Sequence, residues 1–112
     1  MRRGDVFWVR LSPAVGTELR DLHPCVVVQS DLVEHELRPR TIVVPVTSRA
    51  PKRPLPFVVT IEPPEGGLVR TSYVLCDQVT RVDKTRILKC TGSLSAPMMD
   101  RINASLRLVL EL

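Results

Sequence analysis

Short apolar runs rich in valine and isoleucine recur up to about residue 92, and turn residues separate them. Runs of four to eight residues with this composition are typical of β-strands. The run that begins at Cys25 is continuous rather than alternating, which predicts a strand buried on both faces. Pro45 predicts a bulge, a bend or an edge position within its strand. The predicted strands are Val6–Leu11, Cys25–Ser30, Thr41–Thr47, Phe57–Ile61, Ser72–Val79 and Ile87–Gly92.

The end of the chain has a different period. Met99, Ile102, Leu106 and Val109 are spaced by three, four and three residues, which places them on one face of a helix. Ser95 is a favourable N-cap, and proline is tolerated in the first turn. The sequence therefore predicts a C-terminal helix that ends near Glu111 and packs one apolar stripe against the strands.

These elements predict a mainly β (α+β) protein, in which five to seven short strands close into a small barrel that carries a C-terminal α-helix. A length of 112 residues fits one domain, residues 1–112. The sequence contains no apolar stretch near the ~18 residues of a membrane span. Arg10 interrupts the first apolar run, so we expect no signal peptide and a cytoplasmic protein.

The charge is positive and unevenly distributed. Sixteen Lys and Arg residues, thirteen of them Arg, face twelve Asp and Glu residues, which gives a net charge of +4 and a pI near 9.4. One basic cluster comprises Arg38, Arg40, Arg49, Lys52 and Arg53, and a second comprises Arg81, Lys84, Arg86 and Lys89. Arginine binds phosphate through a bidentate fork, so the clusters favour a nucleic-acid partner over a merely solvated face.

Cysteine and histidine do not form a metal-binding pattern. The three cysteines, Cys25, Cys76 and Cys90, are far apart, and only two histidines accompany them. Zinc-site spacing is absent, so we expect no metal and no cofactor. Each cysteine lies among apolar residues, which is typical of buried thiols in a reducing compartment.

Six short segments occur in a characteristic order along the chain. They are RGDVFWV at 3–9, LSPAVGTE at 11–18, HPCVVVQSD at 23–31, VVPVTS at 43–48, DQVTRVDKTR at 77–86 and GSLS at 92–95 before the final helix. Together they resemble motifs of the MazF/PemK (Kid-like) toxin endoribonuclease family. The resemblance covers residues 3 to 112. It implies an SH3-like barrel of the CcdB/MazF type, and a type II toxin that cleaves single-stranded RNA.

The resemblance also implies catalytic residues. In this family the RNA's own 2′-OH attacks the phosphate, without a metal, and leaves 2′,3′-cyclic phosphate and 5′-OH ends. Thr47 matches the family threonine, and Glu18 matches the family glutamate. The family arginine that precedes the proline is replaced here by His23, which can act as a general acid or base. Arg20, three residues earlier, is the second candidate for the missing cation.

Further positions are implied to bind the RNA. Ser48 follows Thr47 as a second donor, and Arg49, Lys52 and Arg53 lie in the loop that covers the RNA groove in the family. The implied roles in the second groove segment are base contacts for Asp77 and Gln78 and a phosphate contact for Arg81. Trp8 is assigned to the protein's own packing or to a dimer interface, not to base stacking.

The expected partners are single-stranded RNA, a second copy of the chain in a homodimer, and an acidic antitoxin peptide that suits a basic groove. Three alternatives stay open, and a purely structural dimer that binds no RNA is one of them. The presence of His23 in place of arginine also fits a catalytically weak or silent RNA-binding homologue. A binding toxin that poisons DNA gyrase is another alternative, although relatives of that kind lack the VTS and DQxxRxD segments found here.

Overall fold

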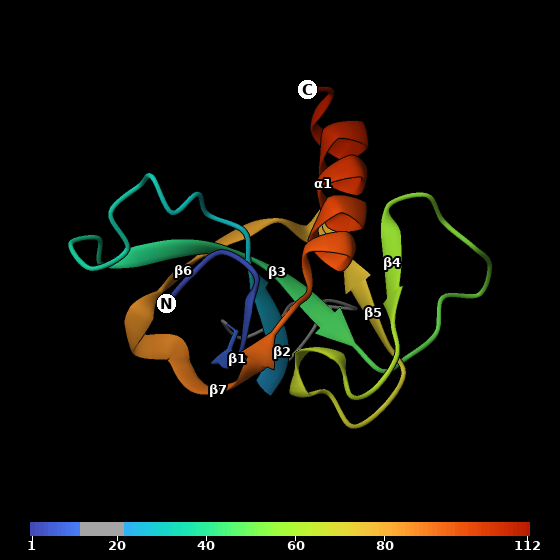
Figure 1. Cartoon of the computed structure of the whole chain (residues 1–112), viewed down its shortest axis with the longest axis horizontal. Coiled ribbons are helices and arrows are strands. Elements are labelled where there is room, and N and C mark those ends of the chain that lie inside the picture. The colour runs from blue at the N-terminus through green and yellow to red at the C-terminus, as the bar shows by residue number, and fades with distance from the viewer. Residues whose placement is uncertain (12–21) are drawn as a thin grey trace.

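The computed structural model describes residues 1–11 and 22–112, and shows a mainly antiparallel β-sheet with one C-terminal helix (Figure 1). The strands follow the order β4-β5-β3-β2-β1-β7, and β6 pairs with β3 beside this path. Three 3-10 turns, η1 (Glu65–Gly67), η2 (Cys76–Gln78) and η3 (Lys84–Arg86), connect strands. The strands and the helix are β1 (Asp5–Arg10), β2 (Leu22–Val27), β3 (Arg40–Thr47), β4 (Val58–Ile61), β5 (Ser72–Leu75), β6 (Thr80–Asp83), β7 (Ile87–Ser93) and α1 (Ala96–Leu110).

Strand β3 organises the sheet because it changes partner along its length. One edge of β3 pairs with β2. The other edge has two partners: residues 40–43, at the start of β3, pair with β6, and Val46 and Thr47, at its end, pair with β5. Pro45 lies between the two partners. Proline has no backbone N–H to donate, so it fits the interval where β6 has ended and β5 has not begun.

The central strands are buried on both faces. Val26 and Val44 belong to a cluster that includes residues of the helix, whereas Val27 and Val43 belong to a second cluster on the opposite face. Successive side chains of a strand point to opposite faces, so a continuous apolar run supplies both clusters. Cys25, Val26 and Val27 are all fully buried, which confirms the prediction for this run.

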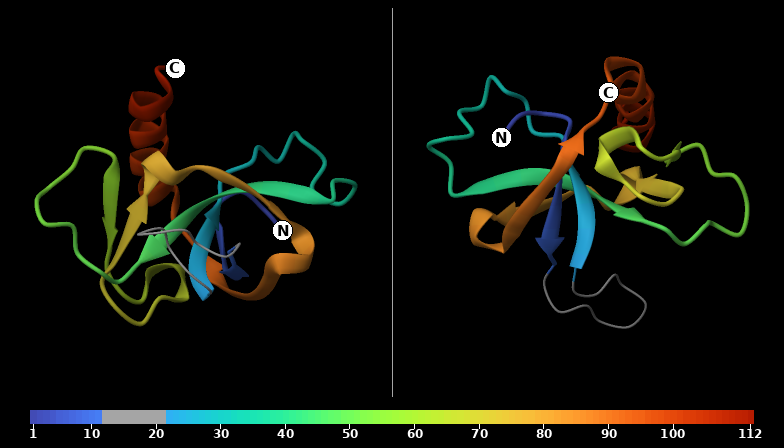
Figure 2. Two further views of the ribbon diagram at one scale, coloured as in Figure 1. Left: turned by 180° about the vertical axis from the view of Figure 1, so that it is seen from behind. Right: turned by 60° about the horizontal axis from the view of Figure 1, so that its bottom comes forward.

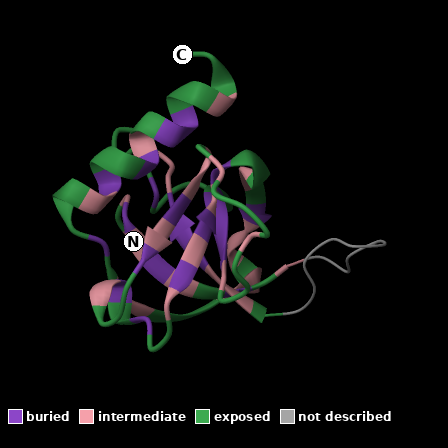
Figure 3. Ribbon diagram, turned by 90° about the vertical axis from the view of Figure 1, so that its right-hand side faces the viewer, coloured by how far each residue is buried: buried purple, intermediate pink, exposed green. Residues whose placement is uncertain are grey.

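Helix α1 covers one face of the sheet, and its buried residues form one stripe (Figure 3). Met99, Ile102 and Leu106 are buried, and Val109 is half-buried. The hydroxyl of Ser95 accepts a hydrogen bond from the backbone N–H of Met98, at 3.3 Å, as expected of an N-cap. In the described parts of the chain, no helix has the length and apolarity to cross a membrane.

The structure corrects two strand boundaries and adds a strand. The predicted strand Ser72–Val79 is wrong in its second half, because the chain leaves β5 after Leu75 and turns through η2. It then re-enters the sheet as β6, which was not predicted as a separate strand. Strand β2 begins at Leu22 and ends at Val27, so it is shifted toward the N-terminus relative to the predicted 25–30.

The expected closure of the barrel is not detected. Among residues 1–11 and 22–112, the strand pairings form a path that starts at β4 and ends at β7, with no ladder joining the two. The views in Figure 2 show the strongly twisted sheet that results. The mainly β architecture and the C-terminal helix are as the sequence predicted.

Candidate active site

A cavity of about 430 Å³ lies where the start of β2 meets the end of β3. It brings together three residues that the sequence singled out, His23, Thr47 and Ser48. We call it the His23–Thr47 cavity. Its other lining residues are Trp8, Leu22, Pro24, Val46, Gly67, Leu68, Val69, Arg70, Ser72 and Thr91.

The pairing of β2 with β3 explains why two residues far apart in the sequence meet here. Cys25 is opposite Pro45, and the strands run antiparallel. Past this pair, the ring of His23 still lies 3.2 Å from the carbonyl oxygen of Val46, so the start of β2 stays beside the end of β3. His23 and Thr47 therefore line the same cavity.

The ring of His23 is half-buried and oriented by the backbone. Its Nδ1 lies 3.2 Å from the carbonyl oxygen of Val46. A carbonyl oxygen only accepts hydrogen bonds, so this contact requires the proton on Nδ1. In the neutral ring, Nε2 then carries the lone pair. The geometry therefore leaves one nitrogen of His23 able to accept a proton.

The hydroxyl of Thr47 is oriented in the same way. Its Oγ1 accepts a hydrogen bond from the backbone N–H of Arg49 at 3.1 Å. A hydroxyl has one proton to donate in addition to its acceptor lone pairs. The Thr47 proton is therefore available to a group in the cavity. Ser48, which follows it, is exposed and adds a second hydroxyl.

Another part of the wall comes from the end of η1 and the segment that leads to β5, and close backbone packing fixes it. Gly66 and Gly67 have φ values of 65° and 72°, a region that favours glycine. A side chain on Gly67 would overlap the carbonyl oxygen of Thr91. The Thr91 hydroxyl donates to the carbonyl oxygen of Gly66 at 2.7 Å. The segment is thereby held against β7.

Trp8 is part of this cavity. Val6 and Val9 are fully buried, while Trp8, between them on β1, is 38% exposed and lines the cavity. It pairs with Pro24 of β2, directly beside His23. The sequence analysis assigned Trp8 to packing or to a dimer interface, and that assignment stays a prediction. What the structure adds is an aromatic face beside the predicted catalytic residues.

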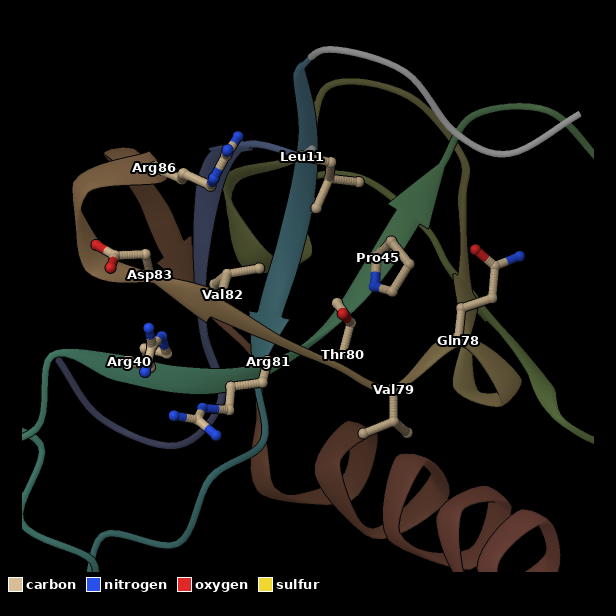
Figure 4. Close-up of a pocket in the computed structure, with 10 residues that line it drawn as sticks. All are labelled: Leu11, Arg40, Pro45, Gln78, Val79, Thr80, Arg81, Val82, Asp83 and Arg86. Atoms are coloured by element: carbon tan, nitrogen blue, oxygen red, sulfur yellow. The ribbon is translucent and has the colours of Figure 1, made fainter. Parts of the chain in front are cut away.

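Two other predicted residues, Gln78 and Arg81, line a separate pocket of about 580 Å³ (Figure 4). We call it the arginine pocket, because Arg40 and Arg86 line it as well. The sequence analysis had placed both of these arginines in the basic clusters but not in the site. In Figure 4, Arg40 and Arg81 lie at one end of the pocket and Gln78 at the other. The pocket thus presents three cations to a ligand.

One carboxylate accompanies these arginines. Asp83 lies opposite Arg40 across the β3–β6 pair and also lines the arginine pocket. Its carboxylate accepts hydrogen bonds from the backbone N–H of Thr85, at 2.9 Å, and from the Thr85 hydroxyl. These bonds, together with the positive charges of Arg40 and Arg86, lower the pKa of Asp83 below its usual range. Asp83 therefore offsets part of the positive charge at neutral pH.

The remaining predicted residues lie outside both cavities or outside the described residues. Arg49, Lys52 and Arg53 are exposed in the segment between β3 and β4, and Asp77 is exposed on η2. None of these four lines either cavity. Glu18 and Arg20, the other two predicted catalytic residues, lie outside the described residues, so their roles stay predictions.

Sequence reasoning did not select Arg70, which lines the His23–Thr47 cavity. No motif marked it, because it stands alone in the short segment before Ser72. Its place depends on the packing of η1 on β7, which joins residues about 25 positions apart in the sequence. A pattern read along the chain does not carry that information.

The lining of the His23–Thr47 cavity suits a phosphate group. Besides the histidine, the described lining residues offer the hydroxyls of Thr47 and Ser48 and one arginine, and none of these described residues is Asp or Glu. The hydroxyls of Ser72 and Thr91 already donate to backbone carbonyl oxygens. Hydroxyls and arginine donate hydrogen bonds to anionic oxygens. Leu22, Pro24 and Val69 supply apolar surface at the same cavity. The arrangement can hold an anion next to a side chain that accepts a proton.

Comparison with solved structures agrees with this fold. The MazF of Deinococcus radiodurans superposes with a TM-score of 0.83 at 24% identity, covering 100% of this chain and 97% of that chain. A mycobacterial endoribonuclease in complex with its cognate antitoxin gives a TM-score of 0.77 at 21% identity, over 100% of this chain and 96% of that one. At these identities the likeness shows the fold.

The sequence comparisons show the family. Residues 2–110 match the family of PemK-like, MazF-like toxins of type II toxin-antitoxin systems. The endoribonuclease EndoA of Bacillus subtilis is 34% identical over 112 residues, covering 100% of this chain and 96% of EndoA. The chain belongs to the PemK/MazF family of type II toxins, which confirms the resemblance found in the sequence.

Proposed function

We propose that this MazF-like toxin endoribonuclease cleaves single-stranded RNA at the His23–Thr47 cavity, using the 2′-OH of the RNA as nucleophile. One observation carries the proposal. Residues from two neighbouring strands place the imidazole of His23 and the hydroxyl of Thr47 at one cavity whose described lining residues include no Asp or Glu. Membership of the family and the 34% identity with EndoA support the same activity.

His23 acts as the general base in this proposal. Its Nδ1 proton is held by the Val46 carbonyl, so Nε2 takes the proton from the 2′-OH. The 2′ oxygen then forms a bond to phosphorus while the bond from phosphorus to the 5′ oxygen breaks. The 5′ oxygen takes up a proton from solvent water as it leaves, and His23 later releases its proton to solvent. The products are a 2′,3′-cyclic phosphate and a 5′-OH end, and the reaction needs no metal because the RNA supplies its own nucleophile.

Thr47 stabilises the charge that develops on the phosphate. Its hydroxyl proton is free, because the N–H of Arg49 occupies an acceptor position on Oγ1. A donor that is oriented before the reaction lowers the barrier more than one that must reorganise. Ser48 adds a donor, and Glu18 and Arg20 remain predicted members of the site from the segment that precedes Leu22.

The substrate extends beyond the cavity. Arg81 and Gln78 lie at the arginine pocket, where we assign Arg81 a contact to the RNA phosphates and Gln78 a contact to a base. Arg49, Lys52 and Arg53 attract the RNA phosphates from the exposed segment after β3. Asp77, exposed on η2, is assigned a base contact. These roles follow the family resemblance and the positive charge of the surface.

The test is cleavage of a long single-stranded RNA in excess EDTA, with both new ends mapped. Wild type, His23→Ala, Thr47→Ala and His23→Arg are compared, with melting curves for each. The proposal expects cyclic-phosphate and 5′-OH ends from wild type and loss of cleavage in His23→Ala. Cleavage gained only in His23→Arg would instead identify a silent RNA-binding homologue. Undiminished cleavage by His23→Ala would exclude His23 as the base.

We also propose the partners expected of such a toxin. The structurally similar mycobacterial endoribonuclease was solved in complex with its cognate antitoxin, which supports an antitoxin for this chain. The net charge of +4 favours an acidic antitoxin peptide. A homodimer in the cytoplasm remains the expected working state. Co-expression with the neighbouring open reading frame, followed by sizing of the purified complex, tests both the partner and the dimer.

A further inference from the structure

We infer that Arg70 supplies the fixed cation that the His23–Thr47 cavity lacks at position 23, and that its guanidinium binds the phosphate at the cleaved bond. This inference rests on the proposed function and names a residue that no motif marked. In this division, His23 moves the proton and Arg70 binds the phosphate charge at the same cavity.

The composition of the cavity supports this role. Among the described residues that line it, Arg70 is the one Lys or Arg, and none is Asp or Glu. Of the described lining residues, one therefore offers a phosphate a permanent positive charge. Arginine stays protonated at all working pH values and binds two phosphate oxygens at once, whereas histidine is charged only in part of the pH range.

The backbone holds Arg70 in place. The hydroxyl of Ser72, a buried residue, donates to the Arg70 carbonyl oxygen at 2.8 Å. A few residues earlier, the Thr91 hydroxyl binds the Gly66 carbonyl oxygen, and a Cβ on Gly92 would lie only 2.8 Å from the backbone of Gly66. Both ends of the segment that carries Arg70 are therefore anchored to strands.

The side chain itself is free to bind a ligand. Arg70 is exposed, and within residues 1–11 and 22–112 its guanidinium has no carboxylate or carbonyl partner. An arginine without an internal partner gives up no interaction of the protein when it binds phosphate. The exposed position also predicts that replacing the side chain leaves the fold intact.

The first test is steady-state cleavage by Arg70→Gln and Arg70→Lys. We expect Arg70→Gln to lower kcat at least tenfold, because a cation at the reacting phosphate acts mainly in the transition state. Arg70→Lys should recover part of the loss, since it keeps the charge without the fork. Arg101→Gln is the matched control, because Arg101 is exposed on α1, away from the cavity. It should change kcat less than twofold.

The second test is chemical rescue by added guanidinium. A free guanidinium ion should recover part of the cleavage in Arg70→Gln, where the cation is missing, but not in His23→Ala, where the base is missing. Failure to recover any cleavage in Arg70→Gln, or equal recovery in both variants, would overturn the inference. So would a kcat for Arg70→Gln within twofold of wild type, even if wild type proves to be a nuclease.

A binding assay separates this inference from the proposed function. A short RNA with 2′-O-methyl groups binds but cannot supply the nucleophile. Arg70→Gln should weaken its binding and reduce the slope of log Kd against log salt by about 0.7, the value for one phosphate contact on a single strand. If wild type cleaves nothing but shows this change, the nuclease proposal fails and the phosphate contact stands. An unchanged slope and affinity overturn the contact.

Discussion

Replacing Thr47 with alanine removes one hydroxyl from the wall of the His23–Thr47 cavity and leaves the backbone of β3 in place. In the structure that hydroxyl makes one hydrogen bond, from the N–H of the exposed Arg49. Water can replace this bond, so the free energy of unfolding should fall by at most about 1 kcal/mol. The melting temperature should then fall by no more than roughly 3–6 °C.

The effect on cleavage should be larger than the effect on stability. Removal of one oriented donor from a developing charge costs about 10²–10³ in rate in other enzymes. We expect a loss of at least tenfold in kcat, which corresponds to about 1.4 kcal/mol of transition-state free energy. Because the donor acts when charge develops, kcat should fall more than KM rises.

The assay is single-turnover cleavage of a fluorescent RNA, measured beside a thermal melt of each protein. Thr60→Ala is the matched control, because Thr60 lies on β4 and does not line the cavity. It should cleave at the wild-type rate. Wild-type turnover by Thr47→Ala with an unchanged melting curve would refute the role of this hydroxyl.

Three further predictions concern packing, pH and thiol chemistry. Gly67→Ala should destabilise the fold by about 2–4 kcal/mol in urea unfolding, because its positive φ is strained for alanine and the added methyl overlaps a carbonyl of β7. Hydrogen bonds from Thr85 lower the pKa of Asp83, so the ionised carboxylate stabilises the fold above about pH 4. This stabilisation is lost as the pH falls through the lowered pKa. The urea midpoint of Asp83→Asn should therefore fall less than that of wild type between pH 5 and pH 2. Cys90 is exposed, so the prediction that each cysteine is buried is wrong for this one. Burial raises the pKa of Cys25 to about 12, so iodoacetamide at pH 8 should alkylate Cys90 and leave Cys25 unmodified, as read by peptide mass spectrometry.

The local pattern was sufficient for most of the secondary structure. The stripe of Met99, Ile102 and Leu106 was enough to predict the helix, because a period of 3.6 residues is specific to helices. The continuous run at Cys25 indicated burial on both faces. The local pattern did not predict the end of β5 at Leu75, because residues 72–79 are strand-like on both sides of the turn at η2.

The reason for that bend is tertiary. Strand β5 pairs with the end of β3, and β6 pairs with its start. The chain must therefore leave the ladder between them, at Cys76–Gln78, to reach a second stretch of the same strand. Nothing in the apolar spacing of 72–79 specifies a change of partner.

Some residues of the site could likewise be predicted from the sequence, and others could not. His23, Thr47 and Ser48 were found because the family motifs name their positions, and the β2–β3 register brings them together. Arg70 was missed because its position depends on glycine packing between η1 and β7. Trp8 was recognised as an aromatic residue, but only the structure shows that it lies on the cavity wall.

The central claim is that the RNA's 2′-OH is the nucleophile and that the His23–Thr47 cavity activates it. The most direct measurement uses an RNA with one mapped cut site and replaces the single 2′-OH at that site by hydrogen. Our account predicts that cleavage at this site stops in EDTA while binding of the RNA is retained. Continued cleavage at the deoxy position, with a 5′-phosphate on the downstream fragment, would contradict it and indicate attack by water.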